Sequence, residues 1–321
     1  MFKKNSKVFL IISIMLLSIV ILSGCSQEKP EQSADSGKTI RMATTIDFYE
    51  REDGLPGLEE AYDFEFDKNA LSTMQVGLSY EALDSDKVDA AVGFATDGRI
   101  AAMDLAILED DKGFFPVYNP APLVRKEILE EYPDLKSLIN KLPPLLDQKT
   151  QIELNKRADV DGEEPDKIAE EFLKEHDLLI ENAEEKNGPA VAVASKPWTE
   201  QLILGNMTVK LLENHGYPVE DRTSLGETSV LRPAIESGEI DIYWEYTGTT
   251  LMTTMGHEEE IIESEEAYNT VKKWDEKNNN IIWLDYADAN NTFCIMMTKE
   301  KSEKLNIKTI SELAEYINNN K

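Results

Sequence analysis

The sequence predicts an α/β protein with two lobes, each built around a central sheet. Short apolar runs with strand character alternate with longer stretches that carry apolar residues at helical spacing. The alternation begins near residue 39 and starts again after the polar, glycine-terminated segment 181–188. Because this alternation is typical of sheets covered by helices, the restart indicates a second lobe.

The first half of the chain begins with strands and becomes helical. We expect strands at 39–44, 62–66, 87–94 and 105–108, and a helix at 77–83. Beyond residue 122 the apolar spacing predicts helices, separated by Pro, Asp and Gly signals, at 123–130, 135–141, 150–157 and 166–176.

The second half returns to alternation. We expect strands at 191–194, at 241–244 and around 293–297, with a further strand after 216–219. A long helix over 199–215 has Thr199 as its expected N-cap. A helix over 229–236 ends at Gly238, and the last helix, 312–317, has Ser311 as its expected cap.

Residues 1–25 have the features of a targeting segment. Lys3, Lys4 and Lys7 precede an apolar run, and Leu22-Ser-Gly-Cys25 resembles a bacterial lipobox. We therefore expect Cys25 to be lipidated and to anchor the protein at the extracytoplasmic face of the cell membrane. An uncleaved N-terminal anchor is the alternative. The polar segment 26–37 is expected to be a flexible tether.

Composition narrows the classes of partner. The chain has 33 Lys and Arg against 62 Asp and Glu, a net charge of −29, which disfavours nucleic acid and anionic membrane surfaces. A saline habitat would explain such acidity, and a solvated acidic surface without special meaning is the alternative. With Cys25 acylated, no internal disulfide is possible, and Cys294 is expected to be a buried thiol.

Enzyme motifs are missing from the sequence. His176, His215 and His257 are widely spaced, and His257-Glu258 lacks a second histidine at helical spacing, so we expect no metal site. No glycine-rich phosphate loop, serine nucleophile elbow or Cys/His pair is found. We expect neither a cofactor nor catalysis.

Four blocks carry a resemblance to a known family. They are Ser195-Lys-Pro-Trp-Thr-Glu-Gln201, Glu245-Tyr-Thr-Gly-Thr249, Phe94-Ala-Thr-Asp-Gly-Arg-Ile100 and Phe114-Phe-Pro-Val-Tyr-Asn-Pro-Ala-Pro122. Together they resemble the extracytoplasmic binding proteins of osmoprotectant ABC importers, which capture glycine betaine, carnitine, choline and related quaternary amines. The resemblance implies a type II periplasmic-binding-protein fold, with ligand between two α/β lobes, and an importer permease as partner.

The order of these blocks is reversed relative to the family, which predicts a circular permutant. The resemblance implies a continuous lobe at 121–289, with the linker 181–188 joining the family's usual ends, and a split lobe made of 38–120 plus 290–321. Residues 40 and 318 should then lie near each other in one lobe. One full complement of blocks favours a closed monomer over a domain-swapped dimer.

The resemblance also implies a ligand site. A quaternary ammonium has no donor hydrogens, so aromatic faces must hold it. The family's four cage tyrosines correspond here to Tyr246, Tyr118, Phe94 and Phe293, of which the two phenylalanines keep the face and lose the hydroxyl. The family's grip on the ligand carboxylate corresponds to Lys196, Arg51 and Thr249.

The expected function is therefore capture of a quaternary ammonium osmoprotectant for an ABC importer. Glycine betaine is the first expectation, because Thr249 favours a zwitterion, and carnitine and choline are the alternatives. A chemosensory or regulatory lipoprotein that binds the same amines without transport is the rival function.

Overall fold

The computed structural model describes residues 39–51, 53–256 and 261–320. The predicted signal segment 1–25, the lipidation at Cys25 and the tether 26–37 lie outside the described residues. Among the helices of the described ranges, none combines the length and the apolar character needed to cross a bilayer.

The first sheet has five strands in the order β2-β1-β3-β10-β4. They are β1 (Met42–Thr44), β2 (Leu71–Thr73), β3 (Ala90–Phe94), β4 (Leu105–Ile107) and β10 (Phe293–Thr298). β1 is parallel to β2 and β3, whereas β10 is antiparallel to β3 and β4. The helical segments between these strands and after β10 are α2 (Ile46–Glu50), α3 (Leu55–Tyr62), η1 (Lys68–Ala70), α4 (Val76–Asp84), α5 (Arg99–Ala102), α14 (Lys299–Leu305) and α15 (Ile310–Asn319).

The second sheet has the order β7-β6-β8-β5-β9. Its strands are β5 (Pro120–Arg125), β6 (Val191–Ala194), β7 (Val219–Arg222), β8 (Ile242–Tyr246) and β9 (Ile281–Trp283). The helical segments between them are α6 (Lys126–Glu131), α7 (Leu135–Ile139), η2 (Pro143–Leu145), α8 (Gln148–Asp159), α9 (Pro165–Glu175), α10 (Thr199–Asn214), α11 (Thr228–Ser237), α12 (Thr247–Thr249), η3 (Thr250–Thr254) and α13 (Ser264–Asn278).

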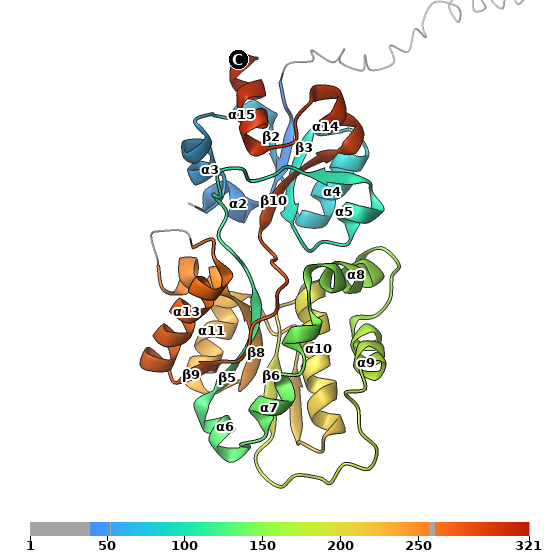
Figure 1. Cartoon of the computed structure of the whole chain (residues 1–321), viewed down its shortest axis with the longest axis vertical. Helices are drawn as coiled ribbons and strands as arrows, with labels where there is room; N and C mark the ends of the chain where they lie inside the picture. Colours follow the sequence, from blue (N-terminus) through green and yellow to red (C-terminus); the bar gives the residue numbers. More distant parts are fainter. Residues whose placement is uncertain (1–38, 52, 257–260, 321) are drawn as a thin grey trace, which may run out of the picture. The chain divides into compact units, whose positions relative to one another are not determined.

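Both sheets share one strand order. In each, an antiparallel strand is inserted between the third and fourth of the other strands, counted along the chain. The chain passes from the first sheet to the second between β4 and β5, and it returns between β9 and β10 (Figure 1). The inserted strands, β5 and β10, directly follow these two crossings. Two segments far apart in the sequence therefore occupy equivalent places in the two sheets.

Apolar strands form the core of each sheet, as the sequence predicts. β6 and β8 are buried along their whole length, and Glu245 is the one charged residue in these two strands, as expected for strands covered by helices on both faces. Ile40 and Ile317, near the two ends of the described chain, belong to one hydrophobic cluster. The helix α15 lies beside α3 (Figure 1). Cys294 is a buried free thiol, as expected.

The segment 181–188 is an ordered loop rather than a helix or strand. The Lys186 ammonium lies 2.7 Å from a carboxylate oxygen of Asp134 and 4.5 Å from the centre of the Tyr217 ring. The backbone N–H of Lys186 donates to the carbonyl of Gly216. One side chain thus attaches this loop to two other parts of the second-sheet region.

Two predicted elements are wrong. Segment 62–66 is not a strand, because Tyr62 ends α3 and the backbone N–H of Phe66 donates to the Glu59 side chain instead of to a neighbouring strand. The alternating aromatic side chains of this segment are buried in the core, although its backbone is not part of the sheet. Residues 123–125 belong to β5 and not to a helix, since a short apolar run buried on both faces has no periodicity to distinguish the two.

Two predicted caps are also wrong. Trp198, not Thr199, is the N-cap of α10. Thr309, not Ser311, caps α15, where its hydroxyl accepts from the Glu312 N–H and the Glu312 side chain accepts from the Thr309 N–H. This capping box was present in the sequence as Thr-x-x-Glu. The predicted end of α11 is confirmed, with Gly238 in the left-handed region at φ 79°.

Candidate functional site

One cavity of about 1090 Å³ contains all seven residues that the sequence predicts for the site. Its walls come from the carboxyl ends of parallel strands and from the start of the inserted strands. Phe94 ends β3, Tyr246 ends β8, and Phe293 begins β10. Open α/β sheets bind ligands at this edge, because several loops converge there.

Five aromatic side chains line the cavity, and we call them the aromatic cluster: Phe94, Tyr118, Trp198, Tyr246 and Phe293. Phe94 and Phe293 are partners across β3 and β10, and their ring centres are 5.4 Å apart. Tyr118 meets Phe293 edge-on at 6.1 Å. The two strand edges therefore bring together residues almost 200 positions apart in the sequence.

Trp198 is the residue of the cluster that sequence reasoning missed. Its ring stacks on Phe94 at 6.2 Å and on Tyr246 at 5.6 Å, with interplanar angles of 6° and 18°. It connects the aromatic residues of the two sheets. The signal was available, because Trp198 follows Lys196-Pro197 in one of the blocks that carry the resemblance.

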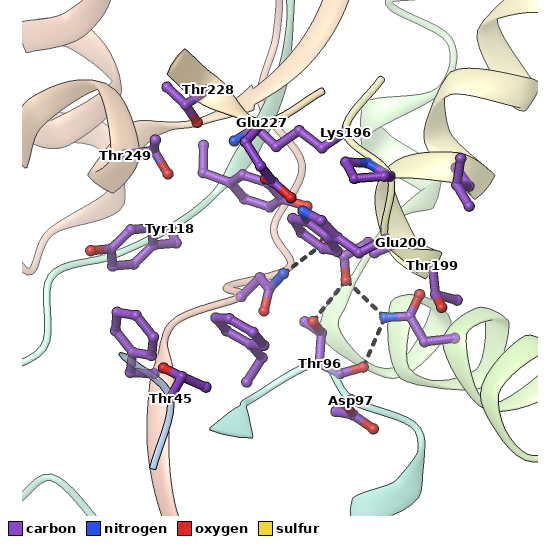
Figure 2. Close-up of a pocket in the computed structure, with 18 of the residues that line it drawn as sticks. Thr45, Thr96, Asp97, Tyr118, Lys196, Thr199, Glu200, Glu227, Thr228 and Thr249 are labelled. Atoms are coloured by element: carbon purple, nitrogen blue, oxygen red, sulfur yellow. Dashed lines mark hydrogen bonds between the residues drawn. The ribbon is translucent and has the colours of Figure 1, made fainter. Parts of the chain in front are cut away.

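Glu200 is the buried polar centre of the site. Its side chain is 2% exposed and accepts four hydrogen bonds. Figure 2 shows Glu200 above Thr96, with a dashed line for the bond between them. One carboxylate oxygen accepts from the Thr96 hydroxyl at 2.7 Å and from the Asn155 amide at 2.8 Å. The other accepts from the Tyr246 hydroxyl at 2.7 Å and from the Asn291 amide at 3.1 Å. Burial raises the pKa of Glu200 above its ordinary value, while these hydrogen bonds act against the rise.

A second buried carboxylate receives the other tyrosine of the cluster. The Tyr118 hydroxyl donates to Asp53, which is 3% exposed. Arg51 forms a two-point ion pair with Asp53, at 2.7 and 2.5 Å, and lies 3.3 Å from the Tyr118 hydroxyl. Burial raises the pKa of the Tyr118 hydroxyl well above its ordinary value, and so it does for Tyr246. Both phenols are thus neutral donors.

Lys196 lies in the cavity wall but already has a counter-ion. Its ammonium is 2.6 Å from the Glu245 carboxylate, and both side chains are buried. The same ammonium is 5.3 Å from the centre of the Tyr246 ring. The Glu245 carboxylate also accepts the backbone N–H of Tyr246 at 2.8 Å. This ion pair therefore holds the end of β8 in place.

Thr249 and Asn291 add polar groups to the wall. Thr249 ends α12, and its carbonyl accepts from the Thr253 hydroxyl. Asn291 donates its amide to Glu200, and its buried side-chain oxygen has no hydrogen-bond partner among the described residues. A hydroxyl or another donor on a bound ligand would satisfy that oxygen.

The positive charges of the cavity wall are paired. Each of its basic side chains has a carboxylate partner, in the pairs Arg51–Asp53, Arg99–Asp97, Lys196–Glu245 and Arg232–Asp275. The wall has three more carboxylates, of which Asp159 and Glu200 accept hydrogen bonds from threonine hydroxyls and Glu227 precedes α11. A wall of this kind is better suited to a cation or a zwitterion than to a simple anion. In the described part of the chain, no group of acidic, histidine and cysteine side chains is arranged to hold a metal ion.

Comparison with known proteins gives a family match over most of the chain. The family described as "Substrate binding domain of ABC-type glycine betaine transport system" matches residues 28–175 and 189–321. The match is interrupted at 176–188, which includes the loop 181–188.

Relatives match a part of the chain. A glycine-betaine-binding protein of Pseudomonas aeruginosa is 38% identical over 149 residues, which cover 46% of this chain and 48% of that protein. The carnitine transport binding protein OpuCC of Listeria monocytogenes is 43% identical over 131 residues, which cover 40% and 42%. A crystal structure of a glycine betaine/carnitine/choline ABC transporter is 39% identical, with a TM-score of 0.37, over 45% of this chain and 52% of that one. The chain spans about half the length of the relatives it matches.

Proposed function

Because the chain belongs to the family of substrate-binding domains of ABC-type glycine betaine transport systems, we propose that it captures a quaternary ammonium osmoprotectant for an ABC importer. The family consists of binding proteins and not of enzymes. The two sheets of one strand order, with exchanged antiparallel strands, form the type II periplasmic-binding-protein fold that the sequence predicts. The observation that carries the proposal is the aromatic cluster in the cavity.

The aromatic cluster is suited to the head group of such a ligand. Aromatic faces attract a cation by their quadrupole, and each face contributes about 0.5–1 kcal/mol at an exposed site and about 2 kcal/mol when it is desolvated. Five rings converge on one cavity, and two of them belong to tyrosines whose hydroxyls are directed to carboxylates. A trimethylammonium group needs no hydrogen-bond acceptor, so an apolar, electron-rich wall is enough to hold it.

Glycine betaine is the ligand we propose first, with carnitine and choline as alternatives. Arg51, which lines the cavity and is 29% exposed in its side chain, is the proposed contact for the ligand carboxylate, because a guanidinium matches the geometry of a carboxylate with parallel N–H donors. Lys196 and Thr249 are proposed to assist. The buried ion pair with Glu245 makes Lys196 the weaker contact of the two basic residues.

We also propose that the chain is a circular permutant of its family. An alignment that keeps chain order can include only one of two exchanged blocks, and the relatives indeed match less than half of this chain. The interruption of the family match at 176–188 supports a junction at 181–188. The common cluster of Ile40 and Ile317 supports new ends that lie close together.

The proposed lobes are 38–120 plus 290–321 and 121–289, and ligand would favour the state in which both contact it. We propose a monomer, anchored through a lipid on Cys25 at the extracytoplasmic face, that delivers its ligand to a permease. A sensory lipoprotein would use the same site. Uptake of labelled ligand by cells that contain or lack the gene distinguishes transport from sensing.

Calorimetric titration with glycine betaine, carnitine and choline tests the proposed function. We expect at least one of the three to bind with a micromolar dissociation constant and to raise the melting temperature. If none binds at millimolar concentration, the proposed function is wrong.

A further inference from the structure

Both tyrosines of the aromatic cluster donate their hydroxyls to buried carboxylates. Tyr246 donates to Glu200, and Tyr118 donates to Asp53. The two pairs come from different parts of the chain. The other three rings of the cluster, two phenylalanines and a tryptophan, have no hydroxyl with which to make such a bond.

We propose that Glu200 and Asp53 are counter-charges behind the cage tyrosines, which make the site selective for a cation over a neutral ligand of the same shape. This inference rests on the proposed function and adds the residues that set its charge selectivity. Neither carboxylate is one of the site residues that the family resemblance supplies.

The hydrogen bonds of Glu200 indicate an ionised carboxylate. Two of its partners are the amide groups of Asn155 and Asn291, and an amide nitrogen can only donate. The Thr96 and Tyr246 hydroxyls complete a set of four neutral partners. Four neutral donors stabilise a negative charge without cancelling it, so the field of Glu200 extends into the cavity.

A carboxylate that accepts from a phenol also changes the ring. The hydrogen bond draws the phenol proton toward the anion, and electron density on the aromatic face rises. A cation on that face then interacts with a more negative quadrupole and, across the ring, with the carboxylate itself.

Glu200 and Asp53 differ in the electrostatic field that they exert on the cavity. Arg51 binds Asp53 through two nitrogens and compensates its charge, whereas the partners of Glu200 are neutral. A compensated anion exerts a weaker field at a distance, since the two charges oppose each other. Glu200 is therefore the dominant counter-charge, and Asp53 the minor one.

The test compares choline with 3,3-dimethylbutan-1-ol, in which carbon replaces the charged nitrogen and the shape and hydroxyl are unchanged. Dissociation constants are measured for the wild-type protein and for Glu200→Gln. We expect the variant to bind choline about tenfold more weakly and the neutral alcohol within about twofold of wild type, because one unit charge at an effective dielectric near 20 acts on the cation alone. Equal losses for both ligands would overturn the proposal, since they indicate a purely structural role.

Asp159→Asn is the matched control. Asp159 lies in the wall of the same cavity, but its partners are Thr199 and Arg99 and not a ring of the cluster. The Asp159→Asn substitution removes one negative charge, as Glu200→Gln does, and we expect it to change choline affinity by less than about threefold. A tenfold loss there would show that any wall carboxylate has the effect, and would contradict a special role for Glu200.

A double-mutant cycle keeps the test independent of the neutral ligand. Tyr246→Phe removes the hydroxyl and keeps the ring, so Glu200→Gln should cost choline affinity less in that background than in the wild type. Additive losses contradict coupling through the phenol. If Glu200→Gln does not fold, Tyr118→Phe and Asp53→Asn form the equivalent cycle. Absence of binding of choline, glycine betaine and carnitine alike by the wild-type protein would instead refute the proposed function.

Discussion

The two sheets share one strand order but make different walls for the cavity. The second-sheet wall is polar and tightly paired, with the buried Lys196–Glu245 ion pair next to Tyr246 and its bond to Glu200. The first-sheet wall presents Phe94 and Phe293. The shared strand order therefore positions the site, whereas the side chains at the strand ends differ: Tyr246 ends β8 beside a buried ion pair, and the ends of β3 and β10 carry two phenylalanines.

Binding energy and selectivity come from different side chains of the cavity wall. Apolar rings contribute contact area and exclude water from any ligand of the right shape. Fixed charges and hydrogen-bonded phenols discriminate between ligands of the same shape. Substitutions around Tyr246 at the end of β8 should thus alter both stability and charge selectivity, and substitutions of Phe94 or Phe293 should alter affinity more uniformly.

The largest expected effect is on the stability of the second-sheet wall. Lys196→Met should lower the free energy of unfolding by about 3–5 kcal/mol, because it leaves the Glu245 carboxylate buried without a counter-ion. Chemical denaturation measures the loss. The double variant Lys196→Met/Glu245→Gln should recover most of it, and failure to recover would mean that packing, not charge, is at stake.

Next in size is the loss of a ring that contacts both Trp198 and Glu200. Tyr246→Ala should weaken every quaternary amine by about a hundredfold, since it removes an aromatic face and leaves Glu200 with one donor fewer. Phe94→Ala should cost only about tenfold. Calorimetry on both variants checks this ranking of affinity losses. A larger loss for Phe94→Ala would mean that the phenylalanines of the first sheet, and not Tyr246, contribute most to binding.

Arg51→Ala should separate ligands by their tails. We expect glycine betaine and carnitine to bind about tenfold more weakly, and choline within about twofold of wild type, because only the first two carry a carboxylate for the guanidinium. Equal weakening of all three in parallel titrations would argue that Arg51 acts through Asp53 and Tyr118, its neighbours in the structure.

The smallest expected effect is a dependence on pH. The raised pKa of Glu200 means that acidification protonates it at a higher pH than an ordinary glutamate. Choline affinity should fall as the pH drops through that pKa, because the ionised form favours the cation, and the profile should be flatter in Glu200→Gln. For the ligand-free protein the sign is opposite. A pKa raised by folding contributes stability at low pH that is lost as the pH rises through it.

Melting temperatures with and without choline, measured across pH, test the pH dependence of choline affinity and that of the stability of the ligand-free protein. The shift caused by choline should grow from acid to neutral pH in the wild type. A shift that is independent of pH in the wild type would contradict the predicted titration of Glu200 over this range of pH.

Sequence patterns correctly predicted the strands that are buried on both faces and the helices that are buried along one face. Buried strands such as β6 and β8 and the helix α9, with its apolar stripe, were predicted because burial on two faces or on one face leaves a regular pattern. Segment 62–66 and residues 123–125 were mispredicted, since the neighbours that decide between strand, loop and helix lie far away in the sequence.

The sequence by itself determined the fold class, the family, and seven residues that line one cavity, because these depend on local patterns and on motifs in consistent register. Only the tertiary structure decided which charges are already paired, that Trp198 links the rings of the two sheets, and that both tyrosines of the cluster donate to buried carboxylates. Those features depend on contacts between residues up to about a hundred positions apart, and such contacts exist only once both sheets have formed.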